Sequence, residues 1–237
     1  PLQDCEGGFT ITRTWSLVDS CGNAAADQVQ TITVLDSIKP TFTAPADTTI
    51  YTDAECEYDT DVEFTGDVED EDDNCSTGLE ATYEDSDPEP LQDCEGGFTI
   101  TRTWSLVDNC GNEADGQIQI ITVLDSIKPT FTAPADTTIY TDAECEYDTD
   151  VEFTGDVTDE DDNCSTELEA TYEDSDPVPL QDCEGGFTIT RTWSLVDSCG
   201  NAAADQVQTI TVLDSIKPTF TAPADTTIYT DAECEYD

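Results

Sequence analysis

The chain has 237 residues, of which 56 are acidic and six are basic, so its formal net charge at neutral pH is −50. This charge excludes nucleic acid as a natural partner and disfavours contact with an anionic membrane surface. No apolar run approaches the roughly 18 residues of a membrane-spanning helix, so we expect no membrane span in this segment. Self-repulsion of this size must be offset by bound divalent cations or screened by high salt.

A repeat with a period of 89 residues runs through the sequence. The segment PLQDCEGG begins at Pro1 and recurs from Pro90 and from Pro179. Residues 1–59 and 179–237 are identical, and the middle copy differs from them at six of these 59 positions. Because such a period matches one small domain, we expect a tandem array that is part of a longer protein.

A proline-bearing segment predicts the boundaries between repeats. Leu35–Pro40 follows an apolar run and recurs as Leu124–Pro129 and Leu213–Pro218, which is typical of a short, stiff linker. The predicted parts are the C-terminal part of a repeat at 1–37, complete repeats at 38–126 and 127–215, and the N-terminal part of a further repeat at 216–237.

The complete repeat 38–126 is predicted to be all-β. Its apolar residues do not form a stripe with a 3.6-residue period; they alternate or cluster in short runs between Gly, Pro, Asp and Asn. The expected strands are Thr48–Thr52, Asp61–Phe64, Leu79–Tyr83, Phe98–Val107 and Gln117–Leu124. Such strands can pack as a small sandwich, so we predict immunoglobulin-like β-sandwich repeats, end to end in a filament.

Two strands depart from simple alternation. Arg102 falls on the same face as Ile100 and Trp104, which requires either a bulge or an arginine packed over the indole ring, and we favour packing. The last strand changes parity between Ile120 and Ile121, which predicts a bulge or burial on both sides. Neither feature implies chemistry.

Eleven cysteines at fixed places in the repeat predict disulfides and an oxidising compartment. A zinc site is the rival hypothesis, but the sequence has no Cys-x-x-Cys pair and no histidine. In an immunoglobulin-like strand order, Cys56 and Cys94 lie at one pole of the repeat, and Cys75 and Cys110 lie in loops at the other. Of three possible connectivities, this placement favours pairing within a repeat. The predicted disulfides are Cys56–Cys94, Cys75–Cys110, Cys145–Cys183 and Cys164–Cys199, which leaves Cys5, Cys21 and Cys234 with partners outside the sequence.

The segment Asp67–Asn74, which recurs as Asp156–Asn163, is crowded with oxygen ligands and predicts a calcium site. Ca²⁺ accepts six to eight oxygens in tolerant geometry, whereas Mg²⁺ demands a strict octahedron. If the strand assignment holds, the loop 108–112 and the linker residue Asp36 lie at the same pole, so a metal there would tie one repeat to the next. The alternative is a set of solvated acids, since the spacing of an EF-hand is absent. The candidate ligands are Asp36, Asp70, Asp72, Asp73, Asn74, Asp108 and Asn112 at one site, and Asp125, Asp159, Asp161, Asp162, Asn163, Asp197 and Asn201 at the other.

No catalytic site is predicted. The chain has no histidine, no Gly-rich phosphate loop and no isolated pair of carboxylates of the kind glycosidases use. It therefore lacks an evident nucleophile, general base or metal-bound water. We do not expect an enzyme.

The segments Phe98–Asn112, Pro129–Ile139 and Asp156–Thr166 carry a likeness that covers the whole chain. They resemble the HYR-like repeats of giant Bacteroidota cell-surface proteins and look most like those of the SprB-type gliding adhesins. The resemblance implies a very long extracellular filament at the outer membrane. It also implies export by the type IX secretion route and propulsion along the cell by a surface motor during gliding motility.

We therefore expect a structural segment of a cell-surface adhesion filament, rigidified by disulfides and calcium. The expected partners are an external surface or polysaccharide, neighbouring filaments and a motility motor. Two other functions stay open: a passive stalk that presents a separate adhesive tip, and an acidic cell-wall or matrix protein. Adhesion that persists in repeats without a tip would exclude the stalk.

Overall fold

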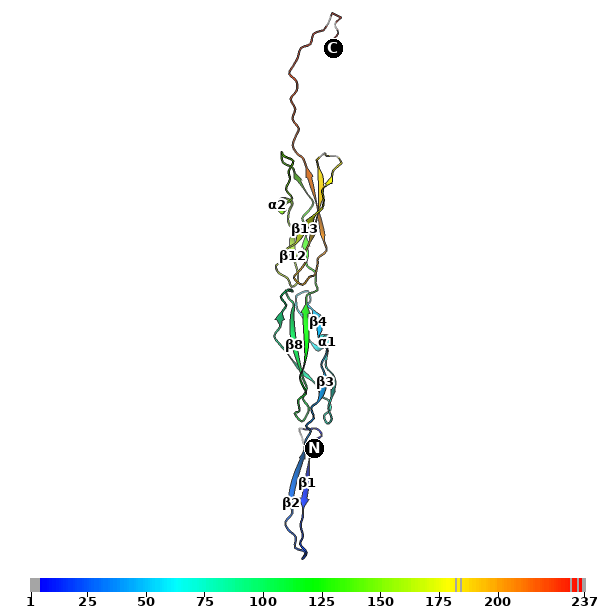
Figure 1. The fold of residues 1–237 in the computed structure, drawn as a ribbon, viewed down its shortest axis with the longest axis vertical. Helices are drawn as coiled ribbons and strands as arrows, with labels where there is room; N and C mark the ends of the chain where they lie inside the picture. Colours follow the sequence, from blue (N-terminus) through cyan, green and yellow to red (C-terminus); the bar gives the residue numbers. More distant parts are fainter. Residues whose placement is uncertain (1–4, 182, 184, 231, 234, 236–237) are drawn as a thin grey trace. The chain divides into compact units, whose positions relative to one another are not determined.

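A computed structural model describes residues 5–181, 183, 185–230, 232–233 and 235, and Figure 1 traces their strands and helical turns along the chain. Contacts divide the chain into two compact units. The first comprises Pro1–Thr132, Asp159–Thr171 and Ser194–Asp205, and the second Ala133–Thr158, Tyr172–Trp193 and Gln206–Asp237. The whole of repeat 38–126 thus lies in the first unit, together with two segments of the following repeat.

Repeat 38–126 is all-β and contains two sheets, as an immunoglobulin-like sandwich requires. Across the larger sheet the strands are β4 (Thr48–Tyr51), β9 (Gln117–Leu124), β8 (Phe98–Ser105) and β6 (Thr82–Asp85), with β7 (Glu89–Pro90) also paired to β8. The strand β4 is parallel to β9, and the other pairs are antiparallel. The smaller sheet pairs β3 (Thr41–Thr43) with β5 (Glu69–Asp72).

The same elements recur in the other copies of the repeat. In the first copy, β1 (Phe9–Trp15) and β2 (Gln28–Val34) form an antiparallel hairpin. In the following copy, β10 pairs with β12, and β11, β16, β15 and β13 form the larger sheet, with β14 paired to β15. Their bounds are β10 (Thr130–Thr132), β11 (Thr137–Tyr140), β12 (Thr158–Asp161), β13 (Thr171–Asp174), β14 (Val178–Pro179), β15 (Phe187–Ser194) and β16 (Gln206–Leu213).

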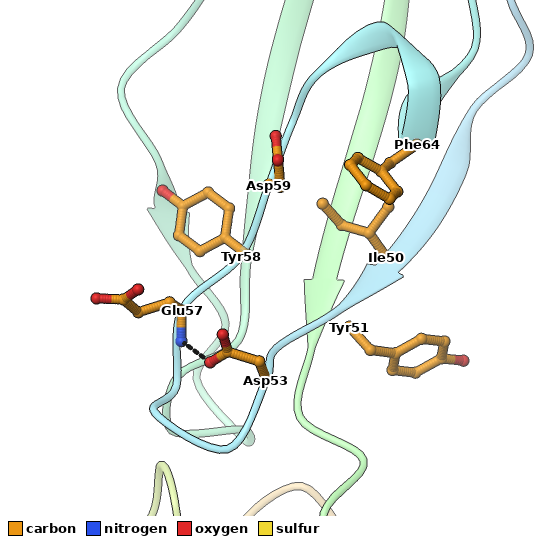
Figure 2. Close-up of a pocket in the computed structure, with 7 residues that line it drawn as sticks. All are labelled: Ile50, Tyr51, Asp53, Glu57, Tyr58, Asp59 and Phe64. Carbon is orange, nitrogen blue, oxygen red and sulfur yellow. Dashed lines mark hydrogen bonds between the residues drawn. The ribbon is translucent and has the colours of Figure 1, made fainter.

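The predicted strand Asp61–Phe64 is wrong, because this segment forms the helical turn α1 (Val62–Thr65). The Thr65 hydroxyl donates to the Asp61 carbonyl at 3.1 Å, and the Gly66 N–H donates to the Val62 carbonyl at 2.8 Å. Gly66 then ends the turn with a φ of 93°, which glycine adopts at little cost. As a result Phe64 is 58% exposed and lines a groove with Ile50, seen in Figure 2.

The corresponding turn of the next copy is α2 (Val151–Thr154). Both helical elements have four residues, and none of the described helices is long and apolar enough to cross a membrane.

The other predicted strands are largely confirmed, but β3, β5 and the short β7 were missed. Gln117–Leu124 is observed as predicted, and the strands beginning at Thr48 and Phe98 end one and two residues earlier than expected. The strand expected at Leu79–Tyr83 begins later, at Thr82. The acidic segment, expected to be a loop, includes β5, whose pairing with β3 contains an irregularity where Asp70 has a φ of 56°.

The core lies on the inner face of the larger sheet. Phe42, Trp104 and Leu106 form a buried cluster, against which partly buried side chains from α1 and the neighbouring loops pack. Along β9, Gln119, Ile121 and Val123 are all buried, and the pairing with β8 continues without a shift. The bulge predicted for this strand is therefore wrong, and the opposite face, with Ile120 and Leu124, is half-buried.

The regular register of β9 places a glutamine in the core. Gln119 is fully buried, and its Nε2 donates to the carbonyl oxygens of Ala46 at 3.0 Å and Thr65 at 2.7 Å. These bonds connect β9 to α1 and to the segment that precedes β4. Gln119 thus fastens the turn to the sheet.

Arg102 strengthens the same connection from β8. It is fully buried, and its Nε and Nη2 donate to the two carboxylate oxygens of Asp85 at 2.7 and 2.8 Å. Its Nη1 donates to the Thr65 hydroxyl at 2.7 Å, and its Nη2 also donates to the Thr60 carbonyl at 2.6 Å. One guanidinium therefore joins β6, β8 and α1.

The packing role predicted for Arg102 holds, but its main aromatic partner is different. The guanidinium carbon lies 3.9 Å from the centroid of the Tyr83 ring and 5.8 Å from that of Trp104. A cation this close to a ring face is stabilised by the ring quadrupole. In the second unit Arg191 lies over Tyr172 in the same way.

Replacing this arginine should strongly destabilise the repeat. We expect Arg102→Ala to lower the free energy of unfolding by about 3 kcal/mol, because it leaves the Asp85 carboxylate and the α1 acceptors without their buried partner. Denaturant unfolding of the oxidised chain measures the change.

Lys39→Ala is the matched control. Lys39 pairs with Asp115 at 2.8 Å, but the two side chains are 61% and 94% exposed, so its loss should leave the unfolding midpoint unchanged. Equal effects of the two substitutions would contradict the structural role of Arg102.

Candidate metal centre

Three disulfides join neighbouring copies of the repeat. They are Cys5–Cys110, Cys56–Cys164 and Cys94–Cys199, with sequence separations of 105, 108 and 105 residues. The last two both connect repeat 38–126 to the following copy. The junction between these two copies is therefore crossed by two disulfides as well as by the chain itself.

The predicted connectivity within a repeat is wrong. Cys56 and Cys94 do share a pole of the repeat, but each bonds to the next copy instead of to the other. The four predicted pairs that do not form are Cys56–Cys94, Cys75–Cys110, Cys145–Cys183 and Cys164–Cys199. The reason is that the two poles of successive copies meet, so the nearest sulfur belongs to a neighbour.

The remaining thiols follow the same rule. Among the described residues, Cys21, Cys75, Cys145 and Cys183 form no disulfide. Shifting each observed disulfide by the 89-residue period assigns all four to partner positions outside the sequence. Cys5, expected to lack a partner here, bonds to Cys110, and Cys234 lies outside the described residues.

A tight turn at residues 94–97 docks on the following copy. The Glu95 carboxylate accepts hydrogen bonds from the N–H and hydroxyl of Thr166 at 3.0 and 2.9 Å, and the Glu95 N–H donates to the Ser198 hydroxyl at 2.8 Å. Gly96 has a φ of 77°, and a Cβ there would lie 2.8 Å from the Cys164 Sγ and 2.9 Å from the Cys56 Sγ. Only glycine fits this contact. These docking residues were not predicted, although the repeated Glu-Gly-Gly segment is a signal for such a turn.

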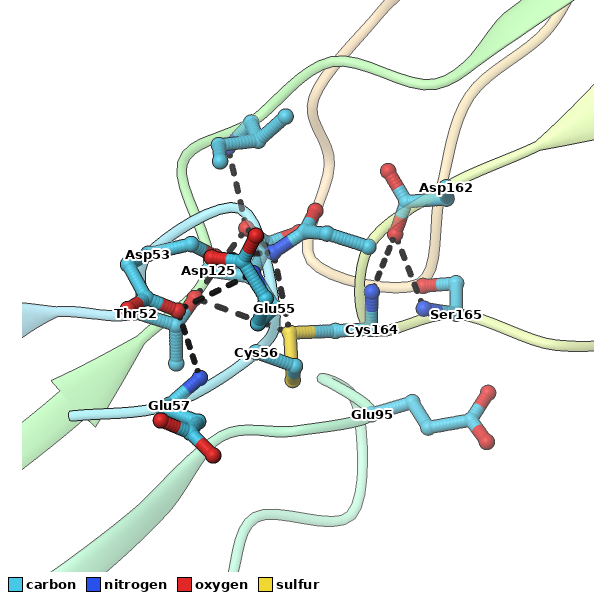
Figure 3. Close-up of a disulfide and its surroundings, with 12 residues drawn as sticks. Thr52, Asp53, Glu55, Cys56, Glu57, Glu95, Asp125, Asp162, Cys164 and Ser165 are labelled. Atoms are coloured by element: carbon cyan, nitrogen blue, oxygen red, sulfur yellow. Dashed lines mark hydrogen bonds between the residues drawn. A yellow bond between two sulfur atoms is a disulfide. The ribbon is translucent and has the colours of Figure 1, made fainter.

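Beside the disulfides, the structure brings three carboxylates together at each of two places. The first group is Asp36, Asp73 and Asp108, and the second is Asp125, Asp162 and Asp197, which are the same positions one period later. In each group, one carboxylate oxygen per residue lies within 4.8 Å of the others. Figure 3 shows Asp125 and Asp162 next to the Cys56–Cys164 bond. We refer to these groups as the first and second carboxylate clusters.

In the second cluster, one oxygen of each of two carboxylates is fixed by hydrogen bonds. The Asp125 Oδ1 accepts from the Ile127 N–H at 2.9 Å and from the Asn163 side chain at 3.2 Å. The Asp162 Oδ2 accepts from the backbone N–H groups of Cys164 and Ser165 at 3.1 and 2.8 Å. Backbone geometry therefore holds these carboxylates in fixed orientations.

The other oxygen of the same carboxylates is buried without a partner. Among the described residues of the second cluster, Asp125 Oδ2 and Asp162 Oδ1 have no hydrogen-bond partner, and neither does the amide oxygen of the neighbouring Asn163. In the first cluster the same holds for Asp36 Oδ2 and Asp73 Oδ1. Asp125 is only 4% exposed. Buried oxygens that lack a donor are costly, and a cation would satisfy several of them at once.

Hydrogen bonds favour the charged state of two carboxylates in the first cluster. Those from the Ser76 and Cys75 N–H groups hold the pKa of Asp73 below its ordinary value. Burial acts against ionisation of Asp108, but hydrogen bonds from Asn112 and Cys110 nevertheless leave its pKa lowered. Charged carboxylates this close repel one another unless a cation lies among them.

Several candidate ligands lie outside the clusters. Asp70 and Asp72 belong to β5 and are exposed there, because the extended strand carries them away from Asp73. Asp159 and Asp161 occupy the same positions in β12. Asn112 and Asn201 instead orient a ligand, since their amide nitrogens donate at 2.7 Å to Asp108 and Asp197 respectively.

The clusters have the chemistry of a hard-cation site. Three carboxylates supply hard oxygen ligands and three negative charges, and Asn163 adds an amide oxygen in the second cluster. Both calcium and magnesium bind such oxygens, but calcium tolerates irregular coordination geometry and is therefore favoured over magnesium.

A scan against known protein families finds no match to this chain, and a search of curated proteins finds none either.

Peptide mapping without reduction tests the connectivity. We expect cross-linked peptides for Cys5–Cys110, Cys56–Cys164 and Cys94–Cys199, because these sulfurs are bonded in the folded chain. Mass spectrometry after proteolysis identifies them, with the reduced and alkylated chain as the control. Recovery of Cys56–Cys94 as the main species would contradict the cross-linked junction.

Proposed function

We propose that this chain is a structural stretch of a long extracellular filament at the cell surface, which adheres to external surfaces during gliding motility. The observation that carries the proposal is the set of disulfides between successive copies of the repeat. Disulfides persist in oxidising surroundings outside the cytosol. A near-identical module that bonds covalently to its neighbours supports a role in extension and load bearing.

The cross-linked junction supports a stiff filament more strongly than paired cysteines within each repeat would. Two disulfides and the chain itself cross the junction after repeat 38–126. Three separate attachments oppose rotation of one copy against the next, whereas a linker alone permits it. Glu95 adds polar contacts to the same junction.

We also propose that each carboxylate cluster binds calcium. The support is the buried, unpartnered oxygens of Asp125 and Asp162 beside a junction disulfide, in a chain whose net charge is −50. An ion there would remove repulsion between carboxylates from two copies of the repeat, and so stabilise their contact.

Calorimetry of the oxidised chain tests whether the carboxylate clusters bind calcium. We expect calcium to bind both described clusters, and Asp125→Asn to abolish binding at the second while leaving the first, because the substitution removes one charge and one buried carboxylate oxygen. Magnesium should bind more weakly.

Asp70→Asn serves as the control for that experiment. Asp70 is acidic and close in sequence to Asp73, but it is exposed on β5, so its replacement should leave calcium binding unchanged. No heat with calcium, or equal losses in the two variants, would exclude a cation at the clusters.

A bead assay tests adhesion by the repeats themselves. Beads coated with the oxidised chain should attach to polysaccharide-coated glass in flow more often than beads coated with an unrelated acidic protein, because many copies of a weak contact add up as avidity. Equal attachment would favour the passive stalk, in which a tip domain carries adhesion.

A further inference from the structure

Each complete copy of the repeat carries an open groove, which is distinct from the carboxylate clusters. The groove in repeat 38–126 has a volume of about 530 Å³ and lies between the end of β4, the loop 53–59 and α1. The corresponding groove of the next copy also measures about 530 Å³ and is formed by the equivalent residues. This size is within the range of small-molecule sites.

Aromatic rings form the walls of the groove. Tyr51, Tyr58 and Phe64 are 58%, 41% and 58% exposed, although large aromatic side chains are usually buried. Tyr58 is held in place by an edge-to-face contact with Phe98, with ring centroids 4.5 Å apart. A ring that is already fixed loses little freedom when a ligand binds. Figure 2 shows Tyr58 and Phe64 on opposite sides of the groove.

Carboxylates supply the polar part of the same groove. The Asp53 Oδ1 accepts hydrogen bonds from the N–H groups of Glu55 and Glu57 at 3.0 and 2.8 Å, and the Asp59 Oδ1 accepts from the Asp61 N–H at 2.9 Å. These bonds orient Asp53 and Asp59 and use only one oxygen of each. None of the residues that line the groove is basic, so the groove attracts a positively charged ligand.

We propose that this groove binds the ammonium groups and ring faces of an amino-sugar polymer. An ammonium group is attracted both to a carboxylate and to the face of an aromatic ring, and the C–H face of a sugar ring packs against the same aromatic surface. A bare metal ion fits the groove poorly, since its oxygen ligands would leave the aromatic rings without contacts. A neutral or acidic glycan lacks the charge that Asp53 and Asp59 select.

The repeated groove suits a repetitive ligand. One groove per copy gives the array many weak sites, and a polymer that carries an ammonium group on each sugar can occupy several of them. The inference rests on the proposed adhesive function and deepens it, because it names the ligand class and the residues that bind it.

The test uses the whole oxidised chain and a tetramer of β-1,4-linked glucosamine, with its N-acetylated form as the neutral match. Calorimetry should show binding of the glucosamine tetramer and at least about 10-fold weaker binding of the N-acetylated form. Phe64→Ala with Phe153→Ala, and separately Asp59→Asn with Asp148→Asn, should each weaken binding by about 3- to 10-fold. Circular dichroism verifies folding, and the exposed Asp59 and Asp148 variants test the site even if the Phe variants unfold.

Ile118→Ala with Val207→Ala is the control, because these exposed apolar residues lie outside the groove; it should change nothing. The proposal is overturned by absent binding, by equal binding of the N-acetylated tetramer, or by groove variants that bind normally. Tetralysine bound as tightly, with the same sensitivity to the variants, would also overturn it in favour of a basic protein partner. If bead adhesion survives the groove variants, the groove is not the adhesive site and the proposed filament function is unaffected. If the chain binds the amino sugar but the beads do not adhere, the groove site stands and adhesion by the repeats is excluded.

Discussion

Mutual repulsion among 56 acidic side chains is the constraint to which the rest of this structure responds. Only six bases oppose them, and two of these, Arg102 and Arg191, are buried in ion pairs that hold a helical turn to a sheet. Lys39 pairs with an exposed acid. Little positive charge within the protein is therefore left to offset the acids, which favours neutralisation by ions in solution.

The junction combines two kinds of attachment with different sensitivities. The disulfides hold neighbouring copies together whatever the ionic strength, whereas the carboxylate clusters would, under the proposed function, respond to the cations around them. Thr52 lies where the two meet, since its hydroxyl is 3.4 Å from the Asp125 Oδ1 and 3.5 Å from the Cys164 Sγ. Under the proposed function, calcium would adjust the contact between copies whose covalent connection is already secured.

The sequence predicted the all-β class and the strand Gln117–Leu124 because alternation and turn residues are local signals. It could not predict the disulfide partners, since near-identical copies place the same cysteine at every 89-residue interval, and periodicity does not reveal which copy supplies the partner. It also failed at Asp61–Phe64, where an alternating Val and Phe suggested a strand. Arg102 and Gln119 instead hold this segment as a helical turn through contacts distant in sequence.

Part of the carboxylate site was predictable and part was not. Asp36, Asp73 and Asp108 were all among the candidates, because the strand order placed their segments at one pole. From composition alone, Asp70 and Asp72 were candidate ligands as good as Asp73. Only the pairing of β5 with β3, a non-local contact that no local pattern indicated, separates these residues from Asp73.

The cross-linked junction also changes what happens when the chain is cut. In a string of domains joined by single linkers, one hydrolysed peptide bond in any linker divides the molecule. Here, a cut between repeat 38–126 and the following copy would still leave Cys56–Cys164 and Cys94–Cys199 in place. Under the proposed extracellular function, the array would survive such damage by a protease as one covalent object.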